Sequence, residues 1–176
     1  MEPHIKHFIN HCWGSIGKDG TYPPFFPGPQ PISIERKHIS ILKRNEYYAC
    51  EKTDGTRIAF VCATINGERV SVIVNRAMNM TPVVFKSLPR KAYQGTILDG
   101  EMVKGSDGKE YLMVYDAIMI SGQDIKNNNL RQRLDLVKKF ASSIMKMKSD
   151  PFVIKLKRFY LIYIKIKILI IVKKVN

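Results

Sequence analysis

A lysine followed closely by an Asp-Gly turn is the segment of this 176-residue sequence with the most distinctive chemistry. The run EKTDGTR occupies residues 51–57, so that Lys52 precedes Arg57 by five positions. A lysine amine can attack the α-phosphorus of a nucleoside triphosphate and form a phosphoramidate, provided that burial or positive charge lowers its pKa from about 10.4. Arg57 is a candidate for that charge and for binding a sugar or a phosphate. The pyrophosphate that leaves needs a divalent metal.

The Asp-Gly pair within this run has two interpretations. In the chemical one, Asp54 fixes the turn that presents Lys52. In the other, the pair forms a plain turn flanked by surface charges. A run with several fixed residue types is more specific than most short motifs, and we therefore favour nucleotidyl chemistry.

Short runs of strand-forming residues between turn signals predict the strands that must position this run. Residues 47–52 are expected to form a short strand, and residues 57–75 a hairpin around the dipeptide Asn-Gly, which is typical of tight turns. Two further strands are predicted over 95–105 and 110–122, with the turn GSDGK between them. The class is therefore α+β, with a mostly antiparallel sheet arranged as a meander.

Helical periodicity predicts three helices around these strands. A short helix followed by a loop is expected within 1–20, and the proline-rich run 22–31 is expected to be an ordered, extended strap. A second helix is expected over 32–45, with Ser33 as its N-cap. The third helix, over 130–148, is amphipathic.

The composition is that of an ordinary globular protein with a basic surplus. The 29 Lys and Arg residues exceed the 15 Asp and Glu residues by 14, a charge that suits a polyanionic partner such as RNA. Neither a disulfide framework nor an apolar leader is visible, so we expect an intracellular, reducing compartment. His4, His7 and His11 would share one helix face, but their spacing does not match a usual zinc pattern, and we predict no metal site.

The last residues differ in composition from the rest of the chain. Residues 161–176 consist almost only of Ile, Leu, Val, Lys and Tyr. A bilayer span takes about 20 apolar residues, so this run is too short, and we predict no membrane span. The alternation over 164–168 predicts a strand, and an interfacial membrane segment is an alternative. We favour the interpretation that this tail was not selected as part of the fold.

The run around Lys52 resembles motif I of the covalent nucleotidyltransferases, the group of DNA ligases, RNA ligases and mRNA capping guanylyltransferases. Further motifs of capping enzymes have similar segments in the same order: the Asp-Arg pair at Asn75-Arg76, motif III at LDGE (98–101), and motif IIIa at VYDAIMISG (114–122). The sequence departs from the pattern at Asn75, where the family has Asp, and at Tyr115, where it usually has Phe.

The segment that precedes these motifs indicates which capping enzymes the chain resembles. FPGPQPISIERK, at 26–37, is similar to the approach segment of capping enzymes from large DNA viruses of algae. The resemblance extends to about Tyr160 and points to a GTP–RNA guanylyltransferase of viral type. It implies the nucleotidyltransferase domain of DNA ligases and capping enzymes, and a setting in a cytoplasmic viral factory, a virion or the host nucleus.

The resemblance implies a role for each matching residue. Lys52 is the nucleophile that takes GMP. Arg57 and Arg76 contact the ribose or the phosphates, Glu101 contacts the ribose hydroxyls or supports Lys52, and Tyr115 stacks on guanine. The implied nucleotide-binding set is completed by Glu51 and Thr53. Taken singly, Arg76 is equally explained as a strand cap, Glu101 as a surface carboxylate and Tyr115 as core packing.

The resemblance also implies a cofactor and partners. These are Mg²⁺ or Mn²⁺, GTP, RNA with a 5′-diphosphate end, and other capping subunits. PFVIKLKRFY, at 151–160, resembles the start of motif P, but motifs IV and V and the OB-fold domain have no counterpart. We therefore divide the chain into a partial nucleotidyltransferase domain (1–160) and the tail (161–176). On this hypothesis the chain is C-terminally truncated, with weak or absent GTP binding and self-guanylylation.

Two other functions stay open at this point. An ATP-dependent polynucleotide ligase shares the lysine chemistry, but the segments IMISG and FPGPQPISIERK argue against it. A non-catalytic protein that binds RNA through its charge, or that associates with membranes, is the other alternative. Labelling with GTP against ATP separates the two enzymes, and a covalent adduct separates both from the third alternative.

Overall fold

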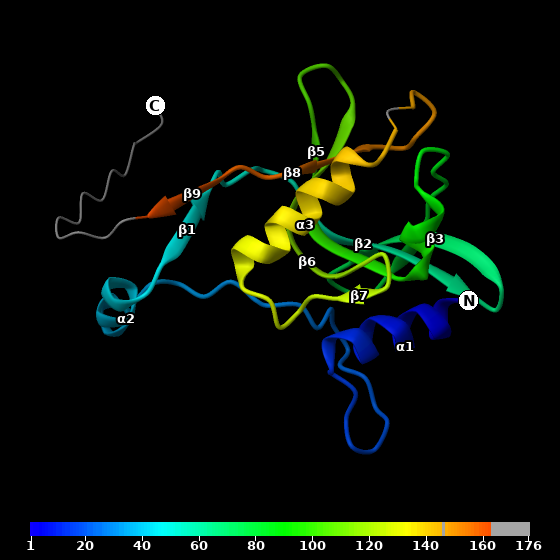
Figure 1. Ribbon diagram of the computed structural model, residues 1–176. Helices are drawn as coiled ribbons and strands as arrows, with labels where there is room; N and C mark the ends of the chain where they lie inside the picture. Colours follow the sequence, from blue (N-terminus) through cyan, green and yellow to red (C-terminus); the bar gives the residue numbers. More distant parts are fainter. Residues whose placement is uncertain (146, 163–176) are drawn as a thin grey trace. The chain divides into compact units, whose positions relative to one another are not determined.

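The structure is a computed structural model that describes residues 1–145 and 147–162, and it divides into two compact units. One unit comprises Met1–Pro29 and Thr53–Lys157, and the other comprises Gln30–Lys52 and the segment that begins at Arg158. Figure 1 shows the course of the chain. The strand predicted over 164–168 lies outside the described residues.

An antiparallel sheet forms the centre of the first unit, with strand order β4-β3-β2-β5-β6-β7 and with β8 added parallel to β6. Its strands are β2 (Thr56–Ile65), β3 (Glu68–Asn75), β4 (Met80–Pro82), β5 (Thr96–Lys104), β6 (Glu110–Ile120), β7 (Gln123–Asp124) and β8 (Val153–Leu156). The predicted hairpin is confirmed as β2 and β3. Asn66 and Gly67 adopt φ values of 51° and 84°, the left-handed conformation that a tight hairpin turn requires.

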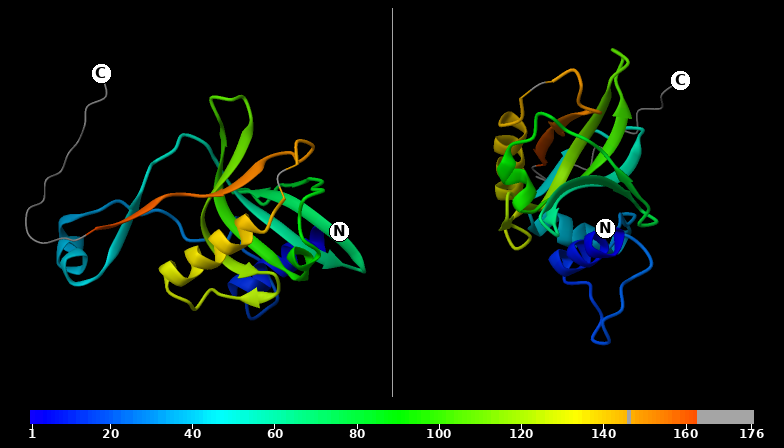
Figure 2. Two further views of the ribbon diagram at one scale, coloured as in Figure 1. Left: turned by 45° about the horizontal axis from the view of Figure 1, so that its top comes forward. Right: turned by 90° about the vertical axis from the view of Figure 1, so that its right-hand side faces the viewer.

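Two helices cover the opposite faces of this sheet, as the right-hand view of Figure 2 shows. Strand β2 explains why, because its residues are buried on both sides. Ile58 and Phe60 belong to the core that contains Val137 and Phe140 of α3 (Leu130–Ser142). Ala59 and Val61, which alternate with them, belong to the core that contains Ile9 of α1 (Glu2–Trp13). The α+β class predicted from the sequence is thus confirmed.

Capping residues mark the end of α1 and the beginning of α3. α1 ends at Gly14, which adopts the left-handed conformation. α3 begins after Asn129, whose side chain accepts a hydrogen bond from the backbone N–H of Gln132 in a capping box. α3 is shorter than the predicted helix over 130–148, because Met145 and Met147 are exposed and give the apolar periodicity nothing to bury against. A 3₁₀ helix, η2 (Arg90–Gln94), precedes β5.

In the part of the second unit that the structure describes, there is one short helix and one pair of strands. α2 (Ile39–Arg44) follows a 3₁₀ turn, η1 (Arg36–His38), and β1 (Tyr47–Cys50) pairs antiparallel with β9 (Phe159–Ile162). Ser33 is therefore not the N-cap, and that prediction is wrong. Glu35 caps the first turn instead, because the backbone before it stays extended and leaves Ile32 and Ile34 exposed.

Strand β9 crosses the predicted boundary between residues 160 and 161. Among the described residues, no helix combines the length and the apolar character that a membrane crossing requires.

Candidate active site

The turn that follows Lys52 is held by Glu101 of β5. One carboxylate oxygen of Glu101 accepts a hydrogen bond from the backbone N–H of Gly55 at 3.1 Å, and the other accepts one from the hydroxyl of Thr53. Asp54 was predicted to fix this turn, but its side chain is exposed and makes no hydrogen bond or ion pair within the described residues. The prediction for Asp54 is thus wrong, because the turn is anchored across the sheet and not within itself.

Steric contact explains why residue 55 of this turn is glycine. A Cβ atom at this position would lie 2.3 Å from the backbone oxygen of Met102 and 2.5 Å from a methyl group of Val103. Only glycine lets the turn approach β5 this closely. The glycine of this Asp-Gly pair is thus explained by contact with the neighbouring strand.

Lys157 completes the surroundings of Glu101. Its ammonium donates to Glu101 at 2.9 Å, and both side chains are largely buried, with 6% and 17% of their surfaces exposed. Burial opposes ionisation of Glu101, but the hydrogen bonds from Thr53 and Lys157 outweigh it, so that its pKa lies below the usual value. Glu101 is therefore an anion at neutral pH and accepts hydrogen bonds without donating any.

Lys157 is a site residue that the sequence reasoning missed. It follows β8, and its backbone N–H donates to the carbonyl of Val114 at 2.8 Å. Its ammonium lies 5.7 Å from the ring centroid of Tyr115, and that of Lys155 lies 3.9 Å from the ring centroid of Tyr111. The available sequence signal for this site was the pair Lys155 and Lys157, two positions apart in an alternating segment. Their position near two tyrosines could not be predicted, because it depends on the pairing of β8 with β6.

A second cluster surrounds Asp99, which is 3% exposed. The Arg57 guanidinium donates to both oxygens of Asp99, at 3.1 and 2.6 Å, and the Tyr115 hydroxyl donates to the first of them at 2.7 Å. Arg57 also donates to the carbonyl of Pro29 at 2.8 Å. Its guanidinium carbon lies 5.6 Å from the ring centroid of Phe26 and 5.9 Å from that of Tyr115. Arg57 is thus fixed from several sides.

Burial sets the protonation of the groups around Asp99. Desolvation raises the pKa of Asp99, although the hydrogen bonds and the charge of Arg57 act in the opposite direction. Burial, and then the charge of Asp99, raises the pKa of the Tyr115 hydroxyl. The hydroxyl therefore stays protonated and donates to Asp99, which leaves the orientation of the ring defined.

Arg76 lies on the loop after β3, on an exposed backbone turn. The side-chain oxygen of Asn75 accepts hydrogen bonds from the backbone N–H groups of Ala77 at 2.9 Å and Asn79 at 3.0 Å. An amide oxygen performs this acceptor role as well as a carboxylate does, so the replacement of Asp by Asn75 leaves the turn intact. The Arg76 carbonyl accepts from the N–H of Phe26 at 3.0 Å, which joins this loop to the segment before Pro29.

The structure therefore brings together four residues of the predicted set: Thr53, Arg57, Glu101 and Tyr115. Glu51 and Lys52 are exposed residues that follow β1 and belong to the second unit, and Lys52 is joined through its peptide bond to Thr53 of the first. Within the described parts of the chain, no group of three or more His, Cys, Asp or Glu residues is placed to hold a metal ion.

Comparison with known proteins places these residues in a family. The family model described as the mRNA capping enzyme, catalytic domain, matches residues 3–176. The mRNA-capping enzyme subunit alpha of Schizosaccharomyces pombe is 36% identical over 141 residues, which cover 72% of this chain and 34% of that protein. The mRNA-capping enzyme of Danio rerio is 32% identical over 160 residues, which cover 82% of this chain and 26% of that protein. The subunit alpha of Neurospora crassa is 31% identical over 129 residues, covering 62% of this chain and 31% of that protein. The chain thus spans about a third or less of the length of these relatives.

Proposed function

Because this chain belongs to the family of mRNA capping enzyme catalytic domains, we propose that it carries the guanylyl-transfer site of mRNA 5′ capping. In this reaction GMP passes from GTP to Lys52 and then to the 5′-diphosphate end of RNA. The observation that carries the proposal is the double role of Glu101, which binds the turn directly after Lys52 and the buried Lys157 at once. The turn that begins at Thr53 is thereby joined to the sheet that carries Tyr115 and Arg57.

The proposed chemistry has two steps at one phosphorus atom. In the first, the neutral Lys52 amine attacks the α-phosphorus of GTP, an N–P bond forms, the bond to pyrophosphate breaks, and the amine loses a proton. In the second, a terminal phosphate oxygen of the RNA attacks the same phosphorus, the N–P bond breaks, and the nitrogen takes up a proton from solvent, which regenerates the Lys52 amine. Arg57 and Arg76 supply positive charge for ribose or phosphate groups, and Glu101 supplies acceptors for ribose hydroxyls.

We propose Mg²⁺ or Mn²⁺ as a companion of the nucleotide. The described residues offer no carboxylate cage, and Mg²⁺ in phosphoryl-transfer sites takes most of its ligands from phosphates and water, with one or two protein carboxylates. Glu101 and Asp99 are the carboxylates of the two clusters, and both already accept hydrogen bonds from cationic side chains. When bound, the ion would stabilise the charge of the leaving pyrophosphate.

The surroundings of Tyr115 favour guanine over adenine. The Tyr115 ring provides an aromatic face for stacking, and the Lys157 ammonium near it is a pure hydrogen-bond donor. Both bases present an acceptor at N7, but guanine presents a second acceptor at O6 where adenine presents a donor at N6. We therefore propose GTP as the substrate, and this argues against the ATP-dependent ligase.

The partners and the setting of this reaction are also proposals. The net charge of +14 suits RNA as the acceptor. The fungal relatives are named as alpha subunits, and by analogy we propose that this chain acts with other capping subunits. The intracellular setting and the viral origin stay predictions, since the relatives named above come from fungi and a fish.

Labelling of the purified chain tests the substrate. The protein is incubated with α-labelled GTP or α-labelled ATP in the presence of Mg²⁺ or Mn²⁺, and is then resolved by denaturing electrophoresis. We expect a label from GTP alone, stable to alkali and lost in acid. A label from ATP would favour the ligase, and salt-dependent RNA binding by a folded protein without a label from either nucleotide would favour the non-catalytic alternative.

A further inference from the structure

Tyr115 lies at an irregularity of the sheet. Asp99 of β5 pairs with Asp116 of β6, but the next residue, Gly100, pairs with Val114, so that Tyr115 is an extra residue of β6. Such a bulge changes the direction of a side chain and leaves its own residue outside the regular pairing. The aim of the Tyr115 ring therefore depends on what fixes β6 on either side of this residue.

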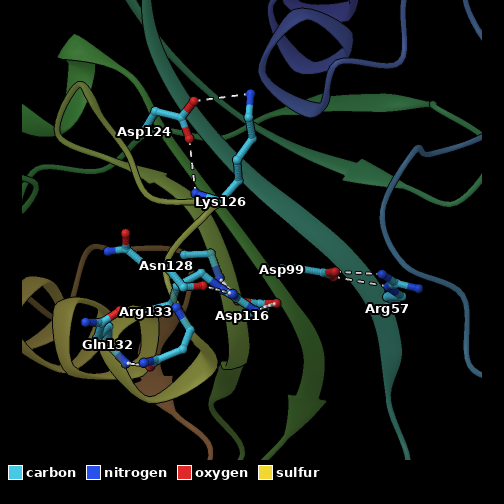
Figure 3. Close-up of polar contacts among 10 residues, drawn as sticks. Arg57, Asp99, Asp116, Asp124, Lys126, Asn128, Gln132 and Arg133 are labelled. Atoms are coloured by element: carbon cyan, nitrogen blue, oxygen red, sulfur yellow. Dashed lines mark hydrogen bonds and ion pairs between the residues drawn. The ribbon is translucent and has the colours of Figure 1, made fainter.

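The strand is anchored directly after Tyr115 by an arginine from α3. Arg133 donates from Nε to one oxygen of Asp116 at 2.7 Å and from a terminal nitrogen to the other at 2.9 Å. The first oxygen also accepts from the backbone N–H of Ala117 at 2.7 Å, so that the carboxylate is bound to its own strand and to α3 (Figure 3). The two side chains are 19% and 18% exposed, which shields this paired contact from solvent.

Arg133 itself is held in place by the start of its helix. It donates to the carbonyl of Asn128 as well as to Asp116, and the preceding capping box joins Asn129 and Gln132 by two reciprocal hydrogen bonds. Leu134, in the next position, is buried. The guanidinium is thus a rigid anchor and not a flexible surface group.

We propose that the Asp116–Arg133 pair is a positioning device that holds the bulge of β6 and thereby aims the Tyr115 ring at the base of the nucleotide. Neither residue of the pair needs to touch the nucleotide, because both act through Tyr115. The inference rests on the proposed function, in which Tyr115 is the stacking platform. Lysine cannot replace Arg133, because a single ammonium cannot bind both carboxylate oxygens in the same planar fork.

A double-mutant cycle on GTP affinity tests whether the pair acts through Tyr115. We expect Arg133→Ala to weaken GTP binding about tenfold in the wild-type background and to have no further effect in the Tyr115→Ala background. Arg133→Lys should resemble Arg133→Ala, and Arg131→Ala, which changes an exposed arginine on the same helix, should bind as the wild type does. Equal effects of Arg133→Ala in both backgrounds would show that it acts through general structure and would overturn the proposal.

A spectroscopic readout keeps this test separate from the proposed function. Fluorine-labelled tyrosine is introduced into the protein, and the Tyr115 resonance is assigned with Tyr115→Phe. We expect Arg133→Ala to shift or broaden this resonance and Arg131→Ala to leave it unchanged. An unchanged resonance in a folded Arg133→Ala protein would overturn the positioning role. If the wild type does not bind GTP, the proposed function fails, while this resonance still decides the role of the pair.

Asp116→Asn serves as the second variant if Arg133→Ala does not fold. It keeps the shape and one acceptor oxygen for the Ala117 N–H, and it removes the charge that Arg133 binds. We expect a shift or broadening of the Tyr115 resonance and a loss of GTP affinity of less than about tenfold. A wild-type resonance and a wild-type affinity in Asp116→Asn would contradict the proposal.

Discussion

Asp99 and Asp116 are directly paired across β5 and β6, yet each carboxylate is bound by an arginine from a different element. Arg57 of β2 binds the first, and Arg133 of α3 binds the second, as Figure 3 shows. Like charges opposite each other destabilise a sheet, so the two arginines make this pairing tolerable. Where β5, which carries Glu101, pairs with β6, which carries Tyr115, the negative charges of Asp99 and Asp116 are thus each balanced by an arginine.

Removal of Arg57 should destabilise the first unit strongly. Arg57→Ala leaves the buried carboxylate of Asp99 without its cation and opposite Asp116, and we expect a loss of about 3 kcal/mol in the free energy of unfolding. Urea denaturation followed by circular dichroism measures it. Asp99→Asn in the same chain removes the unpaired charge and should restore part of the loss. An Arg57→Ala protein as stable as the wild type would show that the pair is not what balances Asp99.

The ion pair between Glu101 and Lys157 should make stability depend on pH. The pKa of Glu101 is lower in the folded protein than its ordinary value of about 4.3, so the unfolded chain binds the proton more readily. Its contribution to stability is therefore present above about pH 4.3 and is lost as the pH falls through the folded pKa.

Urea unfolding of Glu101→Gln at a series of pH values between 6 and 3 checks this sign. We expect the wild type to be the more stable protein at pH 6, and the difference between the two to shrink as the pH is lowered. Lys157→Met, which removes the cation, should reduce the same dependence. A difference that stays constant, or that grows towards acid, would contradict the assignment of this ion pair.

The thiol groups offer a test of the fold that does not involve nucleotides. Burial raises the pKa of Cys12 to about 11 and raises that of Cys62 further, whereas Cys50 is exposed. Because only the thiolate reacts, we expect a disulfide reagent at pH 8 to modify one thiol per folded chain rapidly and all three in denaturant. Cys50→Ser should abolish the rapid phase. A rapid phase that persists in Cys50→Ser would show that the buried thiols are accessible.

Local patterns were sufficient to predict the hairpin and the two strands that carry Glu101 and Tyr115. Runs of strand-forming residues and an Asn-Gly turn are properties of neighbouring residues, and they are visible without the fold. Lys157 was not predicted as a site residue, because it reaches Glu101 only through the parallel pairing of β8 with β6, which joins distant segments. The same holds for the β6 bulge and for the turn after Lys52, which Glu101 holds from another strand.

The predicted helix boundaries were wrong for a related reason. Ser33 was expected to cap a helix because of its residue type, but the backbone turns only after Glu35, where the side chain of His38 completes the capping box. The apolar residues just before this point are exposed and are not buried by helix formation. Periodicity indicates that a segment can form a helix, while burial in the fold decides where the helix begins and ends.

Covalent attachment of GMP to Lys52 is the step on which the proposed function depends, and mass spectrometry detects it directly. The purified chain is incubated with GTP and Mg²⁺ or Mn²⁺, and is digested under alkaline conditions that preserve a phosphoramidate. We expect a peptide carrying one GMP at Lys52, at low stoichiometry if catalysis is slow, and no such adduct in Lys52→Ala or after incubation with ATP. A folded wild-type chain with no adduct above the Lys52→Ala background, or an adduct that persists in Lys52→Ala, would contradict it.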